Sequence, residues 1–89
     1  METFSFTHLV TASNGLHARP AGMLVNQARQ YASSITITHP VSGKSADAKR
    51  LVSVMGLGVK QGDEITLSLI GAQARSEGES LRAYLQEHL

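Results

Sequence analysis

A histidine and an arginine stand two residues apart in the segment NGLHARPAG, residues 14–22. The imidazole of His17 is a nucleophile that can form a bond to phosphorus. Arg19 carries a planar, permanently charged guanidinium that suits two oxygens of a phosphoryl group. Gly15 lets the chain turn sharply and approach the histidine without a side chain in the way. These residue types indicate a site that takes up and gives away a phosphoryl group. The alternative is that His17 merely caps a helix and Arg19 is a solvated surface residue.

An amphipathic helix is expected to begin at or just after His17. Apolar residues follow at helical spacing, namely Ala21, Leu24, Val25, Ala28 and Ala32. The first N–H groups of a helix lack intrahelical partners and carry partial positive charge, so this end favours an anion. Pro20 falls in the first turn, where its missing N–H costs little. The expected phosphoryl-binding residues are Gly15, Ala18, Arg19 and Pro20. We expect Nδ1 of His17 as the acceptor, because it lies nearer the backbone amides than Nε2.

The rest of the chain must position this helix start. Alternation with a period of two predicts strands at 4–12, 34–39 and 65–70, with the outward positions rich in Thr and Ser. The Pro and Gly of HPVSGKS predict a hairpin that pairs residues 41–46 with the strand before it. Residues 48–58 fit about two helical turns that glycines stop.

The last helix has the clearest signals. Ser76 and Glu79 have the spacing of a capping box, and a buried stripe is expected at Leu81, Leu85 and Leu89. The order β-α-β-β-α-β-α predicts an α+β, open-faced β-sandwich, in which a four-stranded antiparallel sheet carries three helices packed on one face. The other face of the sheet is expected to be wet.

Composition narrows the classes of function. The 89 residues predict a single domain, residues 1–89, with one site. The formal charge of +1 argues against nucleic acid as a partner. No stretch is long and apolar enough for a signal peptide or membrane insertion, and cysteines are absent, so a cytoplasmic protein without thiolate metal sites is expected.

Two segments resemble a known family. NGLHARPAGMLV is similar to the active-site segment of HPr, the histidine-containing phosphocarrier of the bacterial phosphoenolpyruvate:sugar phosphotransferase system. SGKSADAKRLVSVMGLGVKQGDEITL is similar to that family's second signature, and the resemblance runs from about residue 8 to residue 71. It implies a monomeric carrier, not an independent catalyst, that needs no cofactor. The motif histidine, His17, would accept phosphate from enzyme I and pass it to enzyme IIA domains of sugar permeases, with Arg19 as its partner.

The resemblance also implies a docking surface on the short helix. The positions whose apolar side chains face the partners in the family are Leu51, Val52 and Met55, with Lys49 and Arg50 beside them. Val54 and Leu57 are expected to be core.

The second signature departs from the family at one position. Many members have a serine directly after the lysine, where a kinase phosphorylates it for regulation. Here Lys49 is followed by Arg50, so this position offers no hydroxyl. Ser45 and Ser53 lie nearby and have the surroundings of ordinary surface serines.

The other histidines predict no metal site, because their spacing does not fit metal ligands. His8 is expected to be a hydrogen-bonded structural histidine on the apolar side of the first strand, and His39 and His88 are expected to be exposed. Asp63 is assigned to turn chemistry.

Three rival functions remain from the sequence. One is an HPr-like carrier in a regulatory branch, such as nitrogen or dihydroxyacetone metabolism. Another is a small acylphosphatase-like hydrolase, although the chain shows neither the glycine-loop motif nor the water-orienting Asn of such enzymes. The third is a binding module without transfer activity, against which His17 and Arg19 argue.

Overall fold

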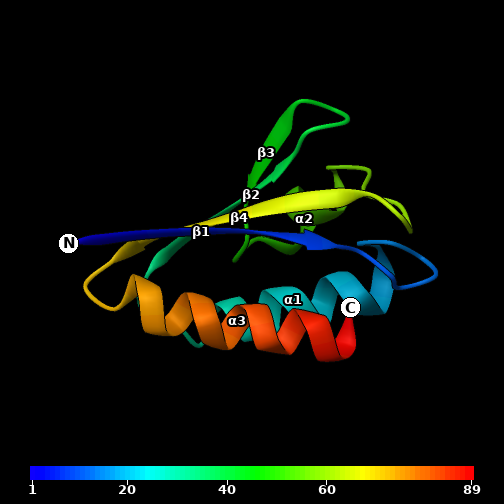
Figure 1. Ribbon diagram of the computed structural model, residues 1–89. Coiled ribbons are helices and arrows are strands. Elements are labelled where there is room, and N and C mark those ends of the chain that lie inside the picture. Colours follow the sequence, from blue (N-terminus) through cyan, green and yellow to red (C-terminus); the bar gives the residue numbers. More distant parts are fainter.

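The computed structural model describes residues 1–89 and contains the elements in the predicted order (Figure 1). The strands are β1 (Glu2–Leu9), β2 (Ser34–His39), β3 (Lys44–Asp47) and β4 (Glu64–Gly71). The helices are α1 (Ala18–Ala28), α2 (Leu51–Met55) and α3 (Ala74–His88). The strands form one antiparallel sheet in the order β1-β4-β2-β3. Figure 1 shows α1 and α3 along the same side of this sheet, which confirms the predicted open-faced β-sandwich.

The sheet and the helices enclose one aliphatic core. Alternate residues of the strands point inward, so Phe6, Ile37 and Leu67 are buried while the Thr and Ser residues between them are exposed or half-buried. α1 and α3 each bury one stripe against the sheet. The predicted stripe of α3 is confirmed, because Leu81, Leu85 and Leu89 are all buried. None of the helices is long and apolar enough to cross a membrane.

Several boundaries differ from the sequence prediction. β3 begins at Lys44 instead of residue 41, because residues 40–43 form the turn, with Gly43 at φ +72°. α1 ends at Ala28, and Ala32 is exposed instead of extending the buried stripe. β1 ends at Leu9 instead of residue 12, because Leu9 pairs with Glu64, the first residue of β4.

Glu77 holds the segment between α1 and β2 in a non-helical path. Its carboxylate accepts hydrogen bonds from the backbone N–H of Ala32 (3.1 Å) and from both the N–H (3.0 Å) and the hydroxyl (2.5 Å) of Ser33. The hydroxyl of Ser33 is the main cause that lowers the pKa of Glu77, so this carboxylate is ionised. Glu77 thereby connects α3 to the segment between α1 and β2.

The predicted capping box of α3 is wrong. The helix starts at Ala74, so Ser76 lies within its first turn and its hydroxyl donates to the Gln73 carbonyl (3.2 Å). Glu79 forms an ion pair with Arg82 (3.1 Å). The carboxylate of Glu2 takes the place of the predicted cap, because it accepts a hydrogen bond from the backbone N–H of Arg75 (3.1 Å). The start of α3 is thus capped by a residue 73 positions away in the sequence instead of by a local motif.

Candidate phosphorylation site

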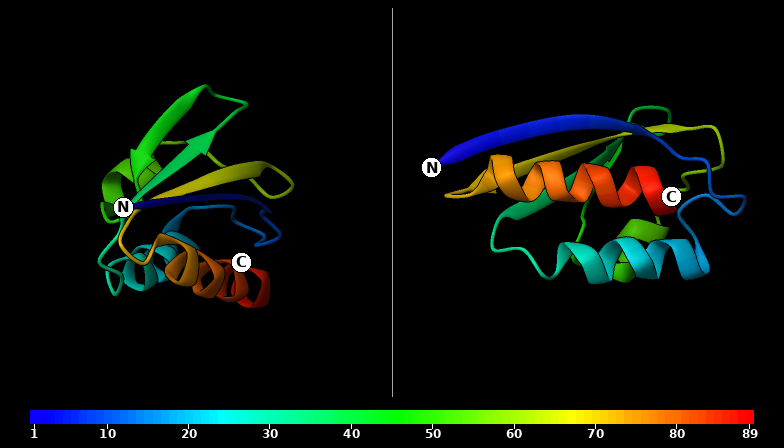
Figure 2. Two further views of the ribbon diagram at one scale, coloured as in Figure 1. Left: turned by 60° about the vertical axis from the view of Figure 1, so that its left-hand side comes forward. Right: turned by 60° about the horizontal axis from the view of Figure 1, so that its bottom comes forward.

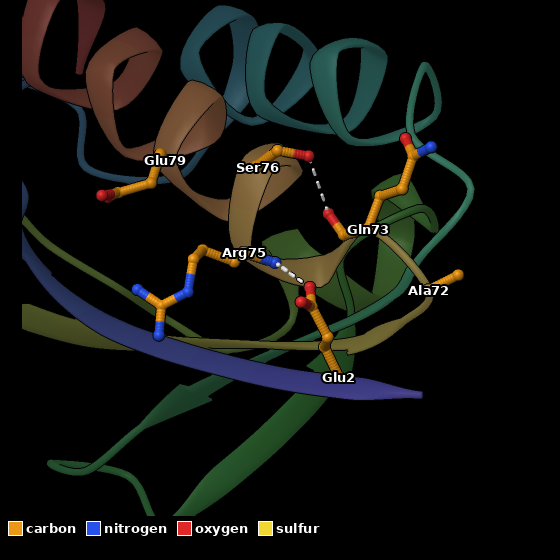
Figure 3. A pocket seen from close by; sticks show the side chains of 6 residues that line it. All are labelled: Glu2, Ala72, Gln73, Arg75, Ser76 and Glu79. Atoms are coloured by element: carbon orange, nitrogen blue, oxygen red, sulfur yellow. Dashed lines mark hydrogen bonds between the residues drawn. The ribbon is translucent and has the colours of Figure 1, made fainter.

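The surface hollow of the protein is not at His17. A shallow hollow of about 440 Å³ lies at the start of α3 (Figure 3), where it is lined by Glu2, Ala72, Gln73, Arg75, Ser76 and Glu79. The helix start is already occupied by the Glu2 carboxylate, and a second carboxylate, that of Glu79, lines the same hollow. Figure 1 shows the start of α3 and the start of α1 at opposite ends of the molecule. The chemistry of the hollow therefore disfavours a phosphoryl group.

His17 occupies the N-cap position of α1. Its backbone is extended (φ −137°, ψ 155°), and its side chain is exposed and makes no capping hydrogen bond. No acidic residue lies in the first turn of the helix, so no carboxylate competes for the positive end of the helix dipole. The imidazole is therefore free for a reaction partner, next to backbone N–H groups that favour an anion.

Ala18 adds backbone strain beside the histidine. Its φ of +53° lies in the left-handed region, which costs a residue with a side chain about 1–2 kcal/mol. Such strain persists only where surrounding structure holds it, and it is concentrated at functional sites. The chain thus turns abruptly between His17 and the rest of α1. Nothing in the sequence signalled this feature, because alanine is an ordinary helix residue.

Gly15 brings the segment around His17, residues 14–22, which we name the histidine segment, against another loop. We name residues 57–63, between α2 and β4, the support loop. Gly15 is buried at φ +61°, and a Cβ placed on it would lie 2.1 Å from the carbonyl oxygen of Val59. The next residue, Leu16, donates its N–H to the same carbonyl (3.1 Å). The support loop therefore holds the two residues that precede His17.

Arg19 and Pro20 lie where the sequence predicts. Both belong to the first turn of α1, Arg19 is exposed, and its guanidinium forms no ion pair within the chain. The long side chain can therefore reach toward an anion held at the helix start. Because the ring of Pro20 replaces an N–H that would have no helical partner, it removes little from the helix.

The short helix α2 presents an apolar surface. Val52 is 81% exposed and Leu51 is 40% exposed, while Met55 is half-buried. Val54 and Leu57 are buried, as the sequence analysis expected. Figure 2 shows α2 beside α1, and the support loop that holds His17 follows α2 directly. The exposed apolar side chains of Leu51 and Val52 thus belong to the helix that lies beside α1.

The basic residues next to α2 differ in what they offer to a partner. Lys49 is half-buried, and its ammonium donates to the carbonyl of Tyr31 (2.7 Å). Arg50 is exposed at the N-cap of α2, with only a loose ion pair to Asp47 (3.8 Å). Of the two, Arg50 is the freer to meet a partner. Ser53 and Ser45 are both exposed.

His39 contradicts the prediction that it is exposed. It is 2% exposed, and both ring nitrogens have partners: Nδ1 lies 3.0 Å from the Leu57 carbonyl and 2.9 Å from the Ser42 hydroxyl, and Nε2 lies 2.9 Å from the Asp63 carboxylate. The missed signal is the alternation of β2, because Ile35 and Ile37 point inward and the same period places His39 inward. Besides its expected role in the turn, Asp63 therefore also contacts the buried ring of His39.

The other two histidines, His8 and His88, have the expected burial, but one expectation for His8 is wrong. His8 is buried as predicted, but its Nε2 has no hydrogen-bond partner, so the prediction of a hydrogen-bonded ring is wrong for this atom. Burial lowers the pKa of His8, against an opposing contribution from the backbone of Leu89, and this favours the neutral ring. His88 is exposed as predicted and lies against Tyr84. No group of His, Asp and Glu residues has the geometry to hold a metal ion.

Comparison with known proteins gives one consistent result. The sequence profile of the family PTS-HPr, described as the PTS HPr component phosphorylation site, matches residues 4–87. The phosphocarrier protein HPr of Vibrio cholerae serotype O1 is 41% identical over 78 residues, which are 88% of this chain and 89% of that protein. The crystal structure of the phosphocarrier protein HPr of Bacillus anthracis str. Ames has a TM-score of 0.84 at 33% identity and covers 94% of this chain and 98% of its own.

A further solved relative differs in its assembly. The catabolite repression protein Crh of Bacillus subtilis, described as an intertwined dimer with a swapping domain, has a TM-score of 0.72 at 35% identity, with 86% of each chain covered. The chain is thus similar both to HPr proteins and to a relative that is described as a dimer.

Proposed function

The chain belongs to the HPr family of phosphocarrier proteins, and from this premise we propose that His17 is the residue that carries the phosphoryl group. As a family member it is a phosphocarrier of the phosphotransferase system and not an independent catalyst, and the hydrolase alternative is not favoured. The observation that carries the assignment to His17 is its exposed, uncapped imidazole at the N-terminus of α1.

The transfer proceeds by exchange of one bond to phosphorus for another. Nδ1 of His17, with the ring proton on Nε2, attacks the phosphorus of the phosphorylated donor, and the bond between phosphorus and the donor breaks as the new N–P bond forms. The N–H groups at the start of α1 and the guanidinium of Arg19 stabilise the phosphoryl oxygens during this step. Transfer to the acceptor is the same exchange in the opposite direction.

Intact-mass measurement of the wild-type protein tests the proposal. After incubation with phosphoenolpyruvate and purified enzyme I, we expect one added phosphoryl group that is lost on brief acid treatment, and ³¹P–¹⁵N correlation should assign it to Nδ1 of His17. An adduct on another residue, or an acid-stable adduct, would contradict the assignment. Turnover of an acyl phosphate without an adduct would support a hydrolase instead.

Membership in the phosphotransferase system implies enzyme I and enzyme II proteins as partners. More specifically, we assign the acceptor role to enzyme IIA domains and the docking role to Leu51, Val52, Met55 and the neighbouring Arg50. The exposure of Val52 and of its neighbour Leu51 supports this surface, because adjacent exposed apolar side chains gain from burial in an interface. Lys49 contributes mainly by holding the carbonyl of Tyr31.

We further propose that the protein is a monomeric, cytoplasmic carrier of one HPr-like domain, residues 1–89. A monomer mass in light scattering is the check on its assembly.

Replacing Arg19 by alanine is expected to slow phosphoryl transfer in both directions about tenfold or more, because one charged donor to the phosphoryl oxygens is lost. The free energy of unfolding should change by less than about 0.5 kcal/mol, since the side chain is exposed and unpaired. Rapid-quench kinetics with enzyme I measures the rates, and Arg75→Ala at the far end of the molecule is the control. A large loss of stability in Arg19→Ala would instead give this side chain a structural role.

Replacing Val52 by aspartate is expected to raise the KM for enzyme I with the fold intact, because a charge is disfavoured at the buried centre of an interface. Val41→Asp is the matched control, since Val41 is 77% exposed in the hairpin turn. Steady-state transfer and the thermal unfolding of both variants provide the measurements. Equal KM values in the two variants would remove α2 from the docking surface.

A further inference from the structure

The pair formed by the buried His39 and the half-buried Asp63 lies at the base of the support loop and is not part of the site described above. His39 is the last residue of β2 and Asp63 is the last residue of the support loop. Their side chains meet at 2.9 Å between Nε2 and Oδ2. The side chain of Asp63 is 24% exposed and that of His39 is 3% exposed, so solvent screens this contact only in part.

The pair ties down both ends of the support loop. At its first residue, the carbonyl of Leu57 lies 3.0 Å from Nδ1 of His39. At its last residue, the carboxylate of Asp63 lies against Nε2 and also accepts the backbone N–H of Lys60 (3.0 Å). The Lys60 N–H, followed by His39, lowers the pKa of Asp63, which keeps this carboxylate ionised. A single buried ring thus spans the loop and fixes where its middle, Val59 and Lys60, lies.

The middle of the loop carries the histidine segment. The carbonyl of Val59 accepts the N–H of Leu16, and Gly15 is packed against the same carbonyl and the Cα of Lys60. The loop is also bonded to the residue that follows β1, because Gly62 donates to the Val10 carbonyl (2.8 Å) and Val10 donates to the Asp63 carbonyl (2.9 Å). Leu16 is one peptide bond from His17, so a shift of Val59 is passed directly to the imidazole.

We propose that His39 and Asp63 are positioning residues for phosphoryl transfer, which act on His17 through the support loop. This inference rests on the proposed role of His17. Transfer between two proteins needs the imidazole in line with the phosphorus, and a misplacement of about 1 Å can cost about a hundredfold in rate. The pair therefore keeps the exposed His17, which has no side-chain cap of its own, in the geometry for transfer.

A glutamine at position 39 or an asparagine at position 63 weakens the pair without placing an unpaired charge in the core. A glutamine side chain can contact only some of the groups that both ring nitrogens of His39 contact. Asparagine replaces the carboxylate of Asp63 that faces Nε2. In His39→Gln and Asp63→Asn, we expect kcat for phosphoryl transfer from enzyme I to fall about tenfold with KM unchanged. In the double variant we expect no further fall, because the two side chains act as one unit.

Two controls separate positioning from a general loss of stability. Thr38→Ala removes a hydroxyl that contacts Ser45 (3.0 Å) on the outer side of the same hairpin. Ile37→Val removes one methyl group from the core and leaves every hydrogen bond of the support loop in place, so it is expected to lower stability alone. Both controls should keep the wild-type kcat when all proteins are measured well below their unfolding temperatures. Hydrogen exchange of the Leu16 amide should be faster in His39→Gln and Asp63→Asn than in either control.

The outcomes distinguish this inference from the function on which it rests. A wild-type protein that accepts no phosphoryl group on His17 would overturn both. A wild-type protein that is phosphorylated there, with kcat in His39→Gln and Asp63→Asn equal to that of Ile37→Val, would overturn only the positioning role. A rise in KM at constant kcat would also overturn it, because that result would assign the pair to partner docking.

Discussion

His17→Gln is expected to lose phosphoryl acceptance completely while it folds as the wild type does. Glutamine has a similar reach and can hydrogen-bond, but its amide nitrogen is not nucleophilic, so no N–P bond can form. The wild-type side chain is exposed and caps nothing, which predicts a change in the free energy of unfolding below about 0.5 kcal/mol. Intact mass after incubation with phosphoenolpyruvate and enzyme I measures the first effect, and urea unfolding measures the second.

His88→Gln is the matched control for this experiment. His88 is the second exposed histidine and lies in α3, against Tyr84. This variant should accept one phosphoryl group at the wild-type rate. The two remaining histidines, His8 and His39, are buried, so neither can approach a donor protein. An adduct that persists in His17→Gln would therefore show that the assignment to the helix start is wrong.

The fold was predictable where a periodic pattern coincides with a buried face. β2 and the inward residues of β4 are as predicted because alternation of Ile and Leu with Thr and Ser leaves one possible orientation in a half-buried sheet. The errors lie at boundaries that long-range contacts decide. Glu77 holds Ala32 and Ser33 outside α1 and Glu2 replaces the predicted cap of α3, and both act from elements distant in sequence. A local pattern carries no information on such partners.

Only part of the candidate site could be predicted from the sequence. Gly15, His17 and Arg19 place a turn, a nucleophile and a fixed cation within five residues, which is compatible with phosphoryl chemistry. These residues alone fit a helix cap and a solvated arginine equally well, and the resemblance to the HPr family is what favours the carrier. The left-handed backbone of Ala18 was hidden, since strain depends on what surrounds the residue. The support loop was hidden as well, because Val59 meets Leu16 across 43 positions of the chain, and only the packing of the folded chain places them together.

Gly15→Ala is expected to damage both stability and transfer. The new methyl group would lie 2.1 Å from the carbonyl oxygen of Val59 and 2.7 Å from the Cα of Lys60, and neither backbone atom can rotate away as a side chain can. The left-handed φ of +61° adds a cost of about 1–2 kcal/mol, and the overpacking adds about 1–3 kcal/mol. We expect a loss of about 3 kcal/mol or more in urea unfolding and a fall of about a hundredfold in the rate of transfer from enzyme I.

Gly43→Ala separates these two costs. Gly43 has a φ of +72°, similar to that of Gly15, but a Cβ there would meet no atom within 4 Å, because it lies at the tip of the hairpin. This variant should lose only the conformational cost of about 1–2 kcal/mol and transfer phosphate at the wild-type rate. If the two variants lost equal stability, the contact between Gly15 and Val59 would contribute nothing measurable to the free energy of unfolding. If Gly15→Ala unfolded earlier yet transferred normally at low temperature, the position of the histidine segment on the support loop would not control the reaction. A loss of both properties in Gly15→Ala alone is the result expected when the same contact holds the fold together and places His17 for transfer.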